Sequence, residues 1–218
     1  YLLYALLKNV YGGQGDQVIS SFRNGLRKTI VDENQKSKIY KLKQSTFPFN
    51  ELLGLKLPAN KTLKISIEDV EEFMNYKKGP NSFFVLSLLY PNLRFNQVHF
   101  QQDHIHPDSR FSDAKLRNEG ILENKWIEWQ NIKDTVSNLQ FLEGRENASK
   151  NATHFKDWFE GTDGNGRENV TDPVKFCQDN FIPNTGYEFQ NFEVFYKNRK
   201  ELMKSELMKV LNLKTDKD

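Results

Sequence analysis

The sequence predicts a mainly α-helical protein with one small β-hairpin embedded in a helical body. Three observations predict this fold class. Several segments repeat apolar residues at intervals of three and four, which is the spacing of one helix face. Two short segments, 96–101 and 139–142, are typical of strands, the first because apolar and polar residues alternate in it. The 17 phenylalanines among 218 residues supply a substantial core and argue against global disorder.

The first 95 residues are predicted to form the helical body. The opening run Tyr1–Leu7 is apolar and lacks both an initial methionine and an N-cap, so it suggests the middle of a helix with further chain before it. After a glycine-rich turn, apolar residues at helical spacing predict a helix over 16–31. Residues 32–46 are polar and lysine-rich without a period, which predicts an exposed connection. The almost wholly apolar run 83–90 predicts a buried core helix.

The rest of the chain is divided into a module at 96–160 and C-terminal helices at 161–218 that pack on the body. The insertion 108–137 separates the two strands, and its spacing predicts two short helices. Two tryptophans in the second of these helices are expected to lie in the core. A long amphipathic helix is predicted over 190–211. Its basic side is expected to be solvated and consists of Lys197, Arg199, Lys200 and Lys204.

A further helix is predicted from about residue 143 to 159. Four apolar residues recur there at offsets of four, three and four: Ala148, Ala152, Phe155 and Phe159. The opposite side would carry a polar set consisting of Asn147, Lys150, Asn151 and His154. We therefore expect these polar side chains to face the two strands.

Charge and cysteine content exclude some classes of protein. The formal net charge of +2 argues against a histone-like polycation, so any nucleic-acid contact must come from a local patch. Cys177 is the sole cysteine, which excludes an internal disulfide and a cysteine-based zinc cluster and indicates a reducing compartment. The opening apolar run is too short to span a membrane. We expect a cytoplasmic protein with no membrane partner.

Side chains between residues 103 and 150 suit the hydrolysis of a phosphodiester. That reaction needs a deprotonated water and a cation that stabilises charge on the phosphate. His104 titrates near neutral pH and can accept the proton. Asp103 and Asn147 can supply the oxygen ligands that Mg²⁺ prefers. Lys150, one helical turn after Asn147, is suited to a phosphate, whereas Asn138 is better suited to brace a loop through backbone hydrogen bonds.

The run Asp103-His104-Ile105-His106-Pro107, followed in order by Asn138, Asn147 and Lys150, resembles the HNH, or ββα-metal, nuclease superfamily. In that superfamily a strand ends in Asp-His-Ile-x-Pro, a second strand carries a structural asparagine, and the next helix brings the last metal ligand. The spacing from Asn138 to Lys150 is also similar to that in the HNH domain of CRISPR effector nucleases. The helical surroundings resemble the C-terminal nuclease region of GmrSD-like, modification-dependent (type IV) restriction proteins.

The resemblance implies an embedded ββα-metal site at 96–160 that cuts DNA with Mg²⁺ or Mn²⁺. It implies that His104 is the general base, that Asp103 and Asn147 are metal ligands, and that Asn138 supports the site. It also implies the effector part of a phage-defence restriction protein with an NTP-using domain upstream. Two features depart from the family. Asn147 replaces the name-giving histidine but keeps an oxygen ligand, and paired Cys-x-x-Cys zinc staples are absent, so helix packing must hold the site rigid.

Alternative interpretations of the same residues stay open. His106 and His99 could form a zinc site with His104, because alternating residues of a strand share a face. His154 is expected either to meet a phosphate or to be a surface histidine. The competing function is a catalytically inactive HNH-like scaffold that binds nucleic acid or a partner protein. A third alternative is a helical interaction domain in which residues 103–107 form a structural turn.

Overall fold

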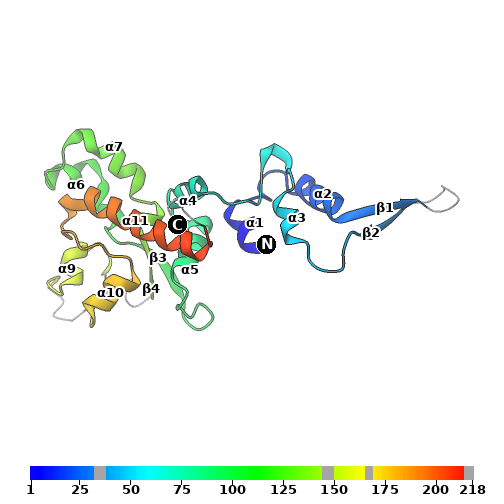
Figure 1. The fold of residues 1–218 in the computed structure, drawn as a ribbon. Coiled ribbons are helices and arrows are strands. Elements are labelled where there is room, and N and C mark those ends of the chain that lie inside the picture. The colour runs from blue at the N-terminus through cyan, green and yellow to red at the C-terminus, as the bar shows by residue number, and fades with distance from the viewer. Residues whose placement is uncertain (32–37, 144–149, 165–168, 214–218) are drawn as a thin grey trace. The chain divides into compact units, whose positions relative to one another are not determined.

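A computed structural model describes residues 1–31, 38–143, 150–164 and 169–213 (Figure 1). The chain folds as two compact units, Tyr1–Ser66 and Ile67–Asp218. The described residues are mainly helical with two small antiparallel two-stranded sheets, so the predicted fold class is confirmed at that level. The unit boundary differs from the predicted one: residues 67–95, expected in the helical body, fold in the same unit as the module at 96–160.

The N-terminal unit combines short helices with one β-hairpin. Its elements are α1 (Leu2–Leu7), α2 (Gly15–Leu26), β1 (Arg27–Val31), β2 (Lys38–Leu42), α3 (Phe49–Leu53) and the 3-10 helix η1 (Pro58–Asn60). One core cluster of this unit consists of seven buried side chains: Ala5, Val10, Val18, Phe22, Leu52, Leu57 and Leu63. α2 contributes two of them four residues apart, so this helix buries the face that its spacing predicts.

The hairpin β1–β2 corrects two predictions. The helix predicted over 16–31 ends at Leu26, and the next five residues form β1. β1 pairs antiparallel with β2, which lies in the segment predicted to be an irregular connection. Ile30, which the helical spacing places on an apolar face, is exposed in β1 instead. The local cause is the run Thr29–Val31, since β-branched side chains lose freedom in a helix and favour strands.

The C-terminal unit packs helices around a second hairpin. Its elements are α4 (Ile67–Met74), α5 (Pro80–Leu89), β3 (Phe100–His104), η2 (Asp108–Phe111), α6 (Asp113–Asn118), α7 (Glu123–Ile132), η3 (Val136–Asn138), β4 (Leu139–Glu143), α9 (Phe155–Phe159), α10 (Pro173–Asp179), η4 (Phe189–Asn191) and α11 (Phe192–Val210). α6 and α7 confirm the two helices predicted in the insertion, and α11 confirms the long C-terminal helix. α11 packs against α4, α5 and η3 and runs through the middle of this unit (Figure 1).

Aromatic side chains fill the core around α11. One cluster joins α11 to the insertion and consists of Phe111, Leu116, Trp126, Trp129, Phe189, Phe192 and Tyr196. A second cluster consists of Ile105, Phe155, Trp158, Val170, Ile182 and Phe195. The expectation that the insertion's two tryptophans lie in the core is confirmed. Among the described helices, none is both long enough and apolar enough to cross a membrane.

The hairpin β3–β4 refines the predicted strands. β4 covers the predicted second strand, but the first strand begins at Phe100 rather than at residue 96, so it includes Asp103 and His104. The helix predicted over 143–159 is interrupted in its described part. Asn151 has a φ of 40°, which is left-handed backbone, and α9 starts only at Phe155. Lys150 and His154 therefore do not lie on one face of a continuous helix, and that prediction is wrong.

Candidate functional site

The hairpin places Asp103 and His104 on opposite faces. Asp103 pairs with Gln140 and His104 with Leu139 in the antiparallel register. Successive side chains of a strand alternate between its faces, so these two neighbours reach different surroundings. The face that carries His104 also carries Phe141, whose ring packs edge-on against Phe83 at 4.7 Å between centroids. This aromatic packing fixes the hairpin against α5.

Asp103 is held by a buried lysine. Its Oδ2 lies 2.9 Å from Nζ of Lys150 and accepts a second hydrogen bond from Nε2 of Gln140 at 3.3 Å. Lys150 is fully buried, and its Nζ also donates to the backbone oxygen of His104. Burial lowers the pKa of the Lys150 ammonium, although the Asp103 carboxylate opposes this effect. Lys150 therefore forms a buried ion pair with Asp103. This burial does not fit the prediction that Lys150 contacts a phosphate.

His104 forms a dyad with Asp134, a residue that sequence reasoning missed. Nε2 of His104 donates to Oδ1 of Asp134 at 2.9 Å. Burial lowers the pKa of His104, against the opposing effect of this hydrogen bond, so the imidazole is neutral at neutral pH. When Nε2 carries the proton, Nδ1 is the nitrogen that can accept one. His104 is therefore a neutral imidazole that is chemically able to accept a proton at Nδ1.

Asp134 belongs to a wider network of charges. Burial favours a higher pKa for its carboxyl group, but hydrogen bonds from Lys133 and His104 outweigh burial and lower the pKa. Nζ of Lys133 lies 2.8 Å from Oδ2 of Asp134 and also contacts Oδ1 of Asp108. His104, Asp108 and Asp134 form one group whose ligand atoms all lie within 4.8 Å of one another, as a metal site requires. The ammonium of Lys133 forms ion pairs with both carboxylates of this group, Asp108 and Asp134, and so already offsets part of their negative charge.

Asn138 braces the loop that follows β3. Its Oδ1 accepts from the backbone nitrogen of His106 at 3.0 Å, and its Nδ2 donates to the backbone oxygens of His106 at 3.0 Å and Lys133 at 2.7 Å. A backbone bond from Ile105 to Asn138 at 2.8 Å continues the pairing beyond the strand. One fully buried amide thus ties the segment after His104 to the turn that carries Asp134. These are the contacts of a structural asparagine rather than of a metal ligand.

His106 lies in the aromatic core rather than in the site. Its ring is 4.8 Å from the ring of Phe195 and 5.5 Å from that of Phe192. Burial lowers its pKa to about 3, helped by the nearby charge of Lys150. The predicted zinc alternative needs His99, His104 and His106 together. The metal-ligand group found among the described residues contains His104 but neither of the others.

The remaining predicted residues are placed as follows. His154 lies 3.1 Å, measured from Nε2, from Oε1 of Glu119, and its ring is 6.0 Å from that of Phe189. It is half-buried beside the insertion, and within the described part of the chain it forms no hydrogen bond or ion pair with Asp103 or His104. Asn147, the predicted second metal ligand, lies outside the described residues. In the described part of the site, Lys150 contacts the carboxylate of Asp103 and the backbone oxygen of His104, whereas the imidazole of His104 contacts Asp134 on the other face of β3.

A fixed turn brings Lys78 to the same place. The backbone nitrogen of Lys78 donates to the backbone oxygen of Asp134 at 2.7 Å, and Lys77 forms a β-bridge with Thr135. Gln102 of β3 clamps Gly79 through two hydrogen bonds of 3.0 Å, one to each backbone polar atom. Lys78 itself is exposed, and its charge adds to the effect of burial in lowering the pKa of His104. Unlike Lys133 and Lys150, it carries no ion pair among the described residues.

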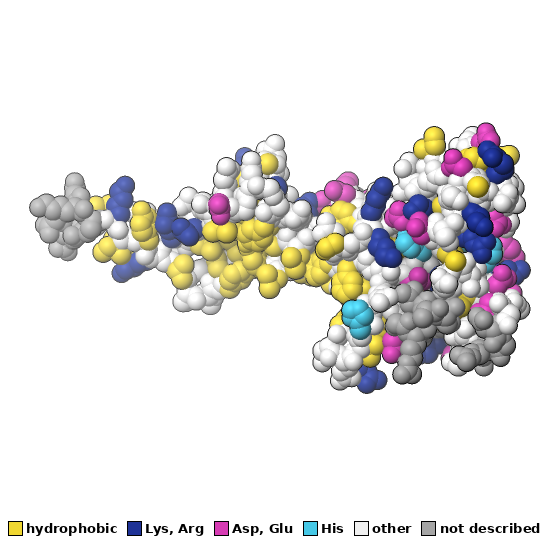
Figure 2. Space-filling view, turned by 180° about the vertical axis from the view of Figure 1, so that it is seen from behind, with side chains coloured by type: hydrophobic (Ala, Val, Ile, Leu, Met, Phe, Trp, Pro, Cys, Tyr) yellow, Lys and Arg dark blue, Asp and Glu magenta, His cyan; other side chains and the backbone are white. Residues whose placement is uncertain are grey.

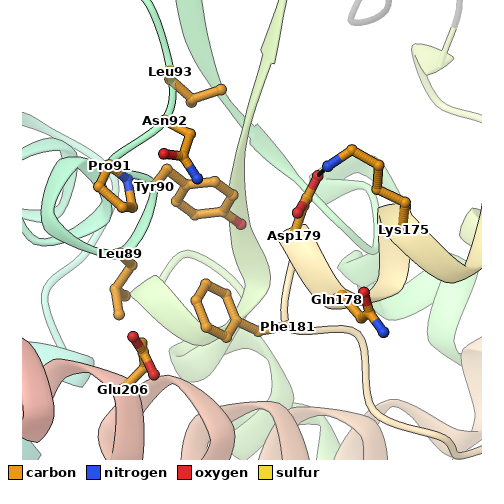
Figure 3. A pocket seen from close by; sticks show the side chains of 10 residues that line it. All are labelled: Leu89, Tyr90, Pro91, Asn92, Leu93, Lys175, Gln178, Asp179, Phe181 and Glu206. Atoms are coloured by element: carbon orange, nitrogen blue, oxygen red, sulfur yellow. Dashed lines mark hydrogen bonds and ion pairs between the residues drawn. The ribbon is translucent and has the colours of Figure 1, made fainter.

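A cavity elsewhere in the C-terminal unit is not part of this site. It has a volume of about 360 Å³ and lies between the end of α5, α10 and α11 (Figure 3). Tyr90 and Phe181 line it, and Lys175 and Asp179 form an ion pair of 2.5 Å at its edge. None of the residues predicted for the phosphodiester site lines it.

Comparisons with known proteins add no family to this geometry. The sequence matches no protein-family model and no curated protein. The evidence that bears on function is therefore the geometry of the site and the motif at residues 103–107.

Proposed function

We propose that this chain is a metal-dependent endonuclease that hydrolyses DNA phosphodiester bonds through His104. The observation that supports this most is the His104–Asp134 dyad of 2.9 Å at the end of a strand whose preceding residue is a carboxylate. A neutral imidazole oriented by a carboxylate suits a general base at neutral pH. In this proposal Nδ1 of His104 takes a proton from the attacking water, and Asp134 stabilises the imidazolium that forms.

The residues present are compatible with an oxygen-ligated cation. Asp103 offers a carboxylate of 13% side-chain exposure whose charge already attracts one cation, the ammonium of Lys150. Mg²⁺ or Mn²⁺ would be held by Asp103 and by the amide oxygen of Asn147. When bound, the ion would stabilise negative charge on the phosphate and on the leaving oxygen. The set of His104, Asp108 and Asp134 is the competing position for a metal, and occupation there would remove His104 as the base.

Lys78 replaces Lys150 as the proposed phosphate contact. Its backbone is fixed beside Asp134, its side chain is exposed, and it lies close enough to His104 to change the pKa of that residue. An ammonium at this position suits a phosphate oxygen of the DNA backbone. The broader proposal, from the resemblance alone, is a cytoplasmic phage-defence restriction effector that works with an upstream NTP-using domain.

A specific observation also favours the second candidate function, an inactive HNH-like scaffold. Lys150 is fully buried against Asp103, so a metal ion must either share this carboxylate with the ammonium or displace it. If the ion pair never opens, the hairpin would hold nucleic acid or a partner protein without cleaving. The two candidates differ in one measurable property, the metal dependence of strand cleavage.

Plasmid nicking tests the proposal. Supercoiled DNA is incubated with Mg²⁺, Mn²⁺ or EDTA and with wild type, His104→Ala, Asn147→Ala or the control His99→Ala, which removes an exposed histidine. We expect metal-dependent nicking that falls by about 10²- to 10⁴-fold in His104→Ala, because that is the usual contribution of a general base. Asn147→Ala should require more metal, and His99→Ala should match wild type. Equal nicking by His104→Ala and wild type would remove His104 from the mechanism.

A further inference from the structure

The two units of the chain carry opposite net charges. Tyr1–Ser66 holds eleven of the 31 lysines and arginines but only four of the 29 acidic residues, which gives a formal net charge of +7. Ile67–Asp218 holds the other 20 basic and 25 acidic residues, a net charge of −5. The overall charge of +2 therefore conceals a strongly basic unit. Such a unit attracts polyanions.

The basic residues concentrate on and around the hairpin β1–β2. Seven lysines and arginines lie between Arg23 and Lys43, against two acidic residues. Nine of the ten strand residues are exposed, so neither face of this two-stranded sheet is covered within the described unit. An isolated hairpin is only marginally stable in water. A surface that is basic and uncovered on both faces is suited to binding a partner.

The register of the hairpin opposes two like charges. Lys28 pairs directly with Lys41 across the strands. Side chains directly opposite on one face are close neighbours, and like charges in these positions are destabilising. Neither lysine forms an ion pair within the part of the chain that the structure describes. A polyanion bound along this face would convert that repulsion into attraction.

Apolar and aromatic side chains accompany the charges. Ile30 pairs with Ile39 on the same face as Lys28 and Lys41, and both isoleucines are exposed. On the other face the guanidinium carbon of Arg27 lies 4.0 Å from the ring centre of Tyr40. Figure 2 shows dark-blue and yellow side chains side by side along this hairpin. The major groove of DNA admits a two-stranded β-ribbon, whose basic residues then meet the phosphates.

We propose that β1–β2 is a DNA-binding ribbon whose phosphate contacts are Lys28 and Lys41 on one face and Lys38 on the other. The ribbon would bring the chain to duplex DNA whether or not cleavage follows. The charge, exposure and register of the hairpin support the binding surface itself. The choice of duplex DNA over other polyanions rests on the proposed nuclease function.

Fluorescence anisotropy of a labelled duplex of about 30 base pairs tests this proposal. EDTA is present throughout, so metal-dependent cleavage does not contribute. We expect Lys28→Gln/Lys38→Gln/Lys41→Gln to bind at least about tenfold more weakly than wild type near 100 mM salt. The slope of log affinity against log salt should become shallower by about 3, because each lost phosphate contact contributes about 0.9. The corresponding triple Lys→Arg variant keeps the charges and should bind like wild type.

A matched control removes three exposed lysines from the acidic unit: Lys115→Gln/Lys197→Gln/Lys209→Gln. It should keep wild-type affinity, and circular dichroism checks that each variant is folded. Equal affinity of wild type and the hairpin variant would overturn the proposal, as would equal loss in both triple variants. Binding to phosphatidylserine vesicles but not to DNA would also overturn it. DNA binding through the hairpin without any nicking would contradict the proposed function and leave this inference standing.

Discussion

At the scale of single residues, the orientation of His104 depends on Asp134. The carboxylate accepts from Nε2 and is itself held by Lys133 at 2.8 Å. We predict that Asp134→Asn lowers the nicking rate by about 10²- to 10⁴-fold, because the carboxylate holds the imidazole in the tautomer that a general base needs. Asp108→Asn is the matched control, because Asp108 contacts Lys133 but forms no hydrogen bond with His104 among the described residues. Equal losses in both variants would indicate instead that the metal lies between His104, Asp108 and Asp134.

His106 gives a residue-scale prediction about stability and pH. Its pKa is about 3 in the folded chain and near the ordinary 6.5 when unfolded. As the pH falls below 6.5, the unfolded chain binds a proton that the folded chain does not, so stability is lost between about pH 6.5 and 3. From pH 7 to pH 4.5 this residue should reduce the free energy of unfolding by about 2 to 3 kcal/mol.

Urea unfolding of His106→Leu and His99→Leu at these two pH values measures this contribution. The His106→Leu variant should lose less stability on acidification than wild type, because it lacks the buried imidazole. His99 is exposed, so its replacement should leave the pH dependence unchanged. The same pH dependence in all three proteins would show that His106 does not stay neutral in the fold.

The sequence alone identifies only part of the site. The sequence shows that Asp103 and His104 are adjacent. The structure adds that their side chains lie on opposite faces of β3. Asp134 stands 30 residues away at the end of the insertion, and no spacing rule connects it to His104. Lys150 has the spacing of a phosphate ligand, but only the tertiary fold reveals that it is buried.

At the scale of elements, α11 supports the turn that carries Asp134 and Asn138. Arg199 is fully buried in this helix and donates to the backbone oxygens of Ser137 at 2.8 Å and Asn180 at 3.1 Å. It also donates to the hydroxyl of Tyr90 at 3.2 Å. The expectation that the basic side of this helix is solvated is wrong for Arg199. The sequence does indicate that Arg199 is buried, because its position has the helical spacing of the buried residues of α11. These are Phe192, Phe195, Tyr196, Met203 and Leu207.

Replacing Arg199 should therefore destabilise the C-terminal unit. Arg199→Leu leaves buried carbonyl oxygens without their donors, and each such group costs about 1 to 3 kcal/mol. We predict a loss of about 2 to 5 kcal/mol in the free energy of unfolding, measured by urea denaturation. Arg199→Lys should recover only part of it, because an ammonium lacks the planar fork of donors. Lys197→Leu, at an exposed position of the same helix, should cost little. If Arg199→Leu left the free energy of unfolding unchanged, Arg199 would not have this supporting role.

Local sequence signals predict some elements better than others. Helices with a clear apolar face, such as α2 and α11, follow their spacing. β1 and β2 are not predicted from spacing. An exposed hairpin buries neither face, so its sequence does not alternate between apolar and polar residues. The break before α9 has the same character, since a left-handed Asn151 interrupts a helical pattern that is otherwise regular.

At the scale of the whole molecule, the fold class can be predicted from the composition and from the spacing of apolar residues. The division into two units cannot. The apolar residues of 67–95 could pack equally well against the segment before them or the segment after them. Only the tertiary packing assigns them to the C-terminal unit. The division then reveals what the overall net charge of +2 conceals, a basic unit followed by an acidic one. The DNA-binding ribbon and the hydrolytic site are thereby proposed for different units, so their variants should separate affinity from cleavage.

The central claim is that His104 is the base that activates water for DNA cleavage. Chemical rescue tests it most directly: the single-turnover nicking rate of His104→Gly is measured in Mn²⁺ with and without added imidazole. If His104 acts as the base, the variant is almost inactive alone, and imidazole restores nicking in proportion to the concentration of its neutral form. Wild-type nicking by His104→Gly without imidazole would contradict the claim, and so would an inactive variant that no concentration of imidazole restores.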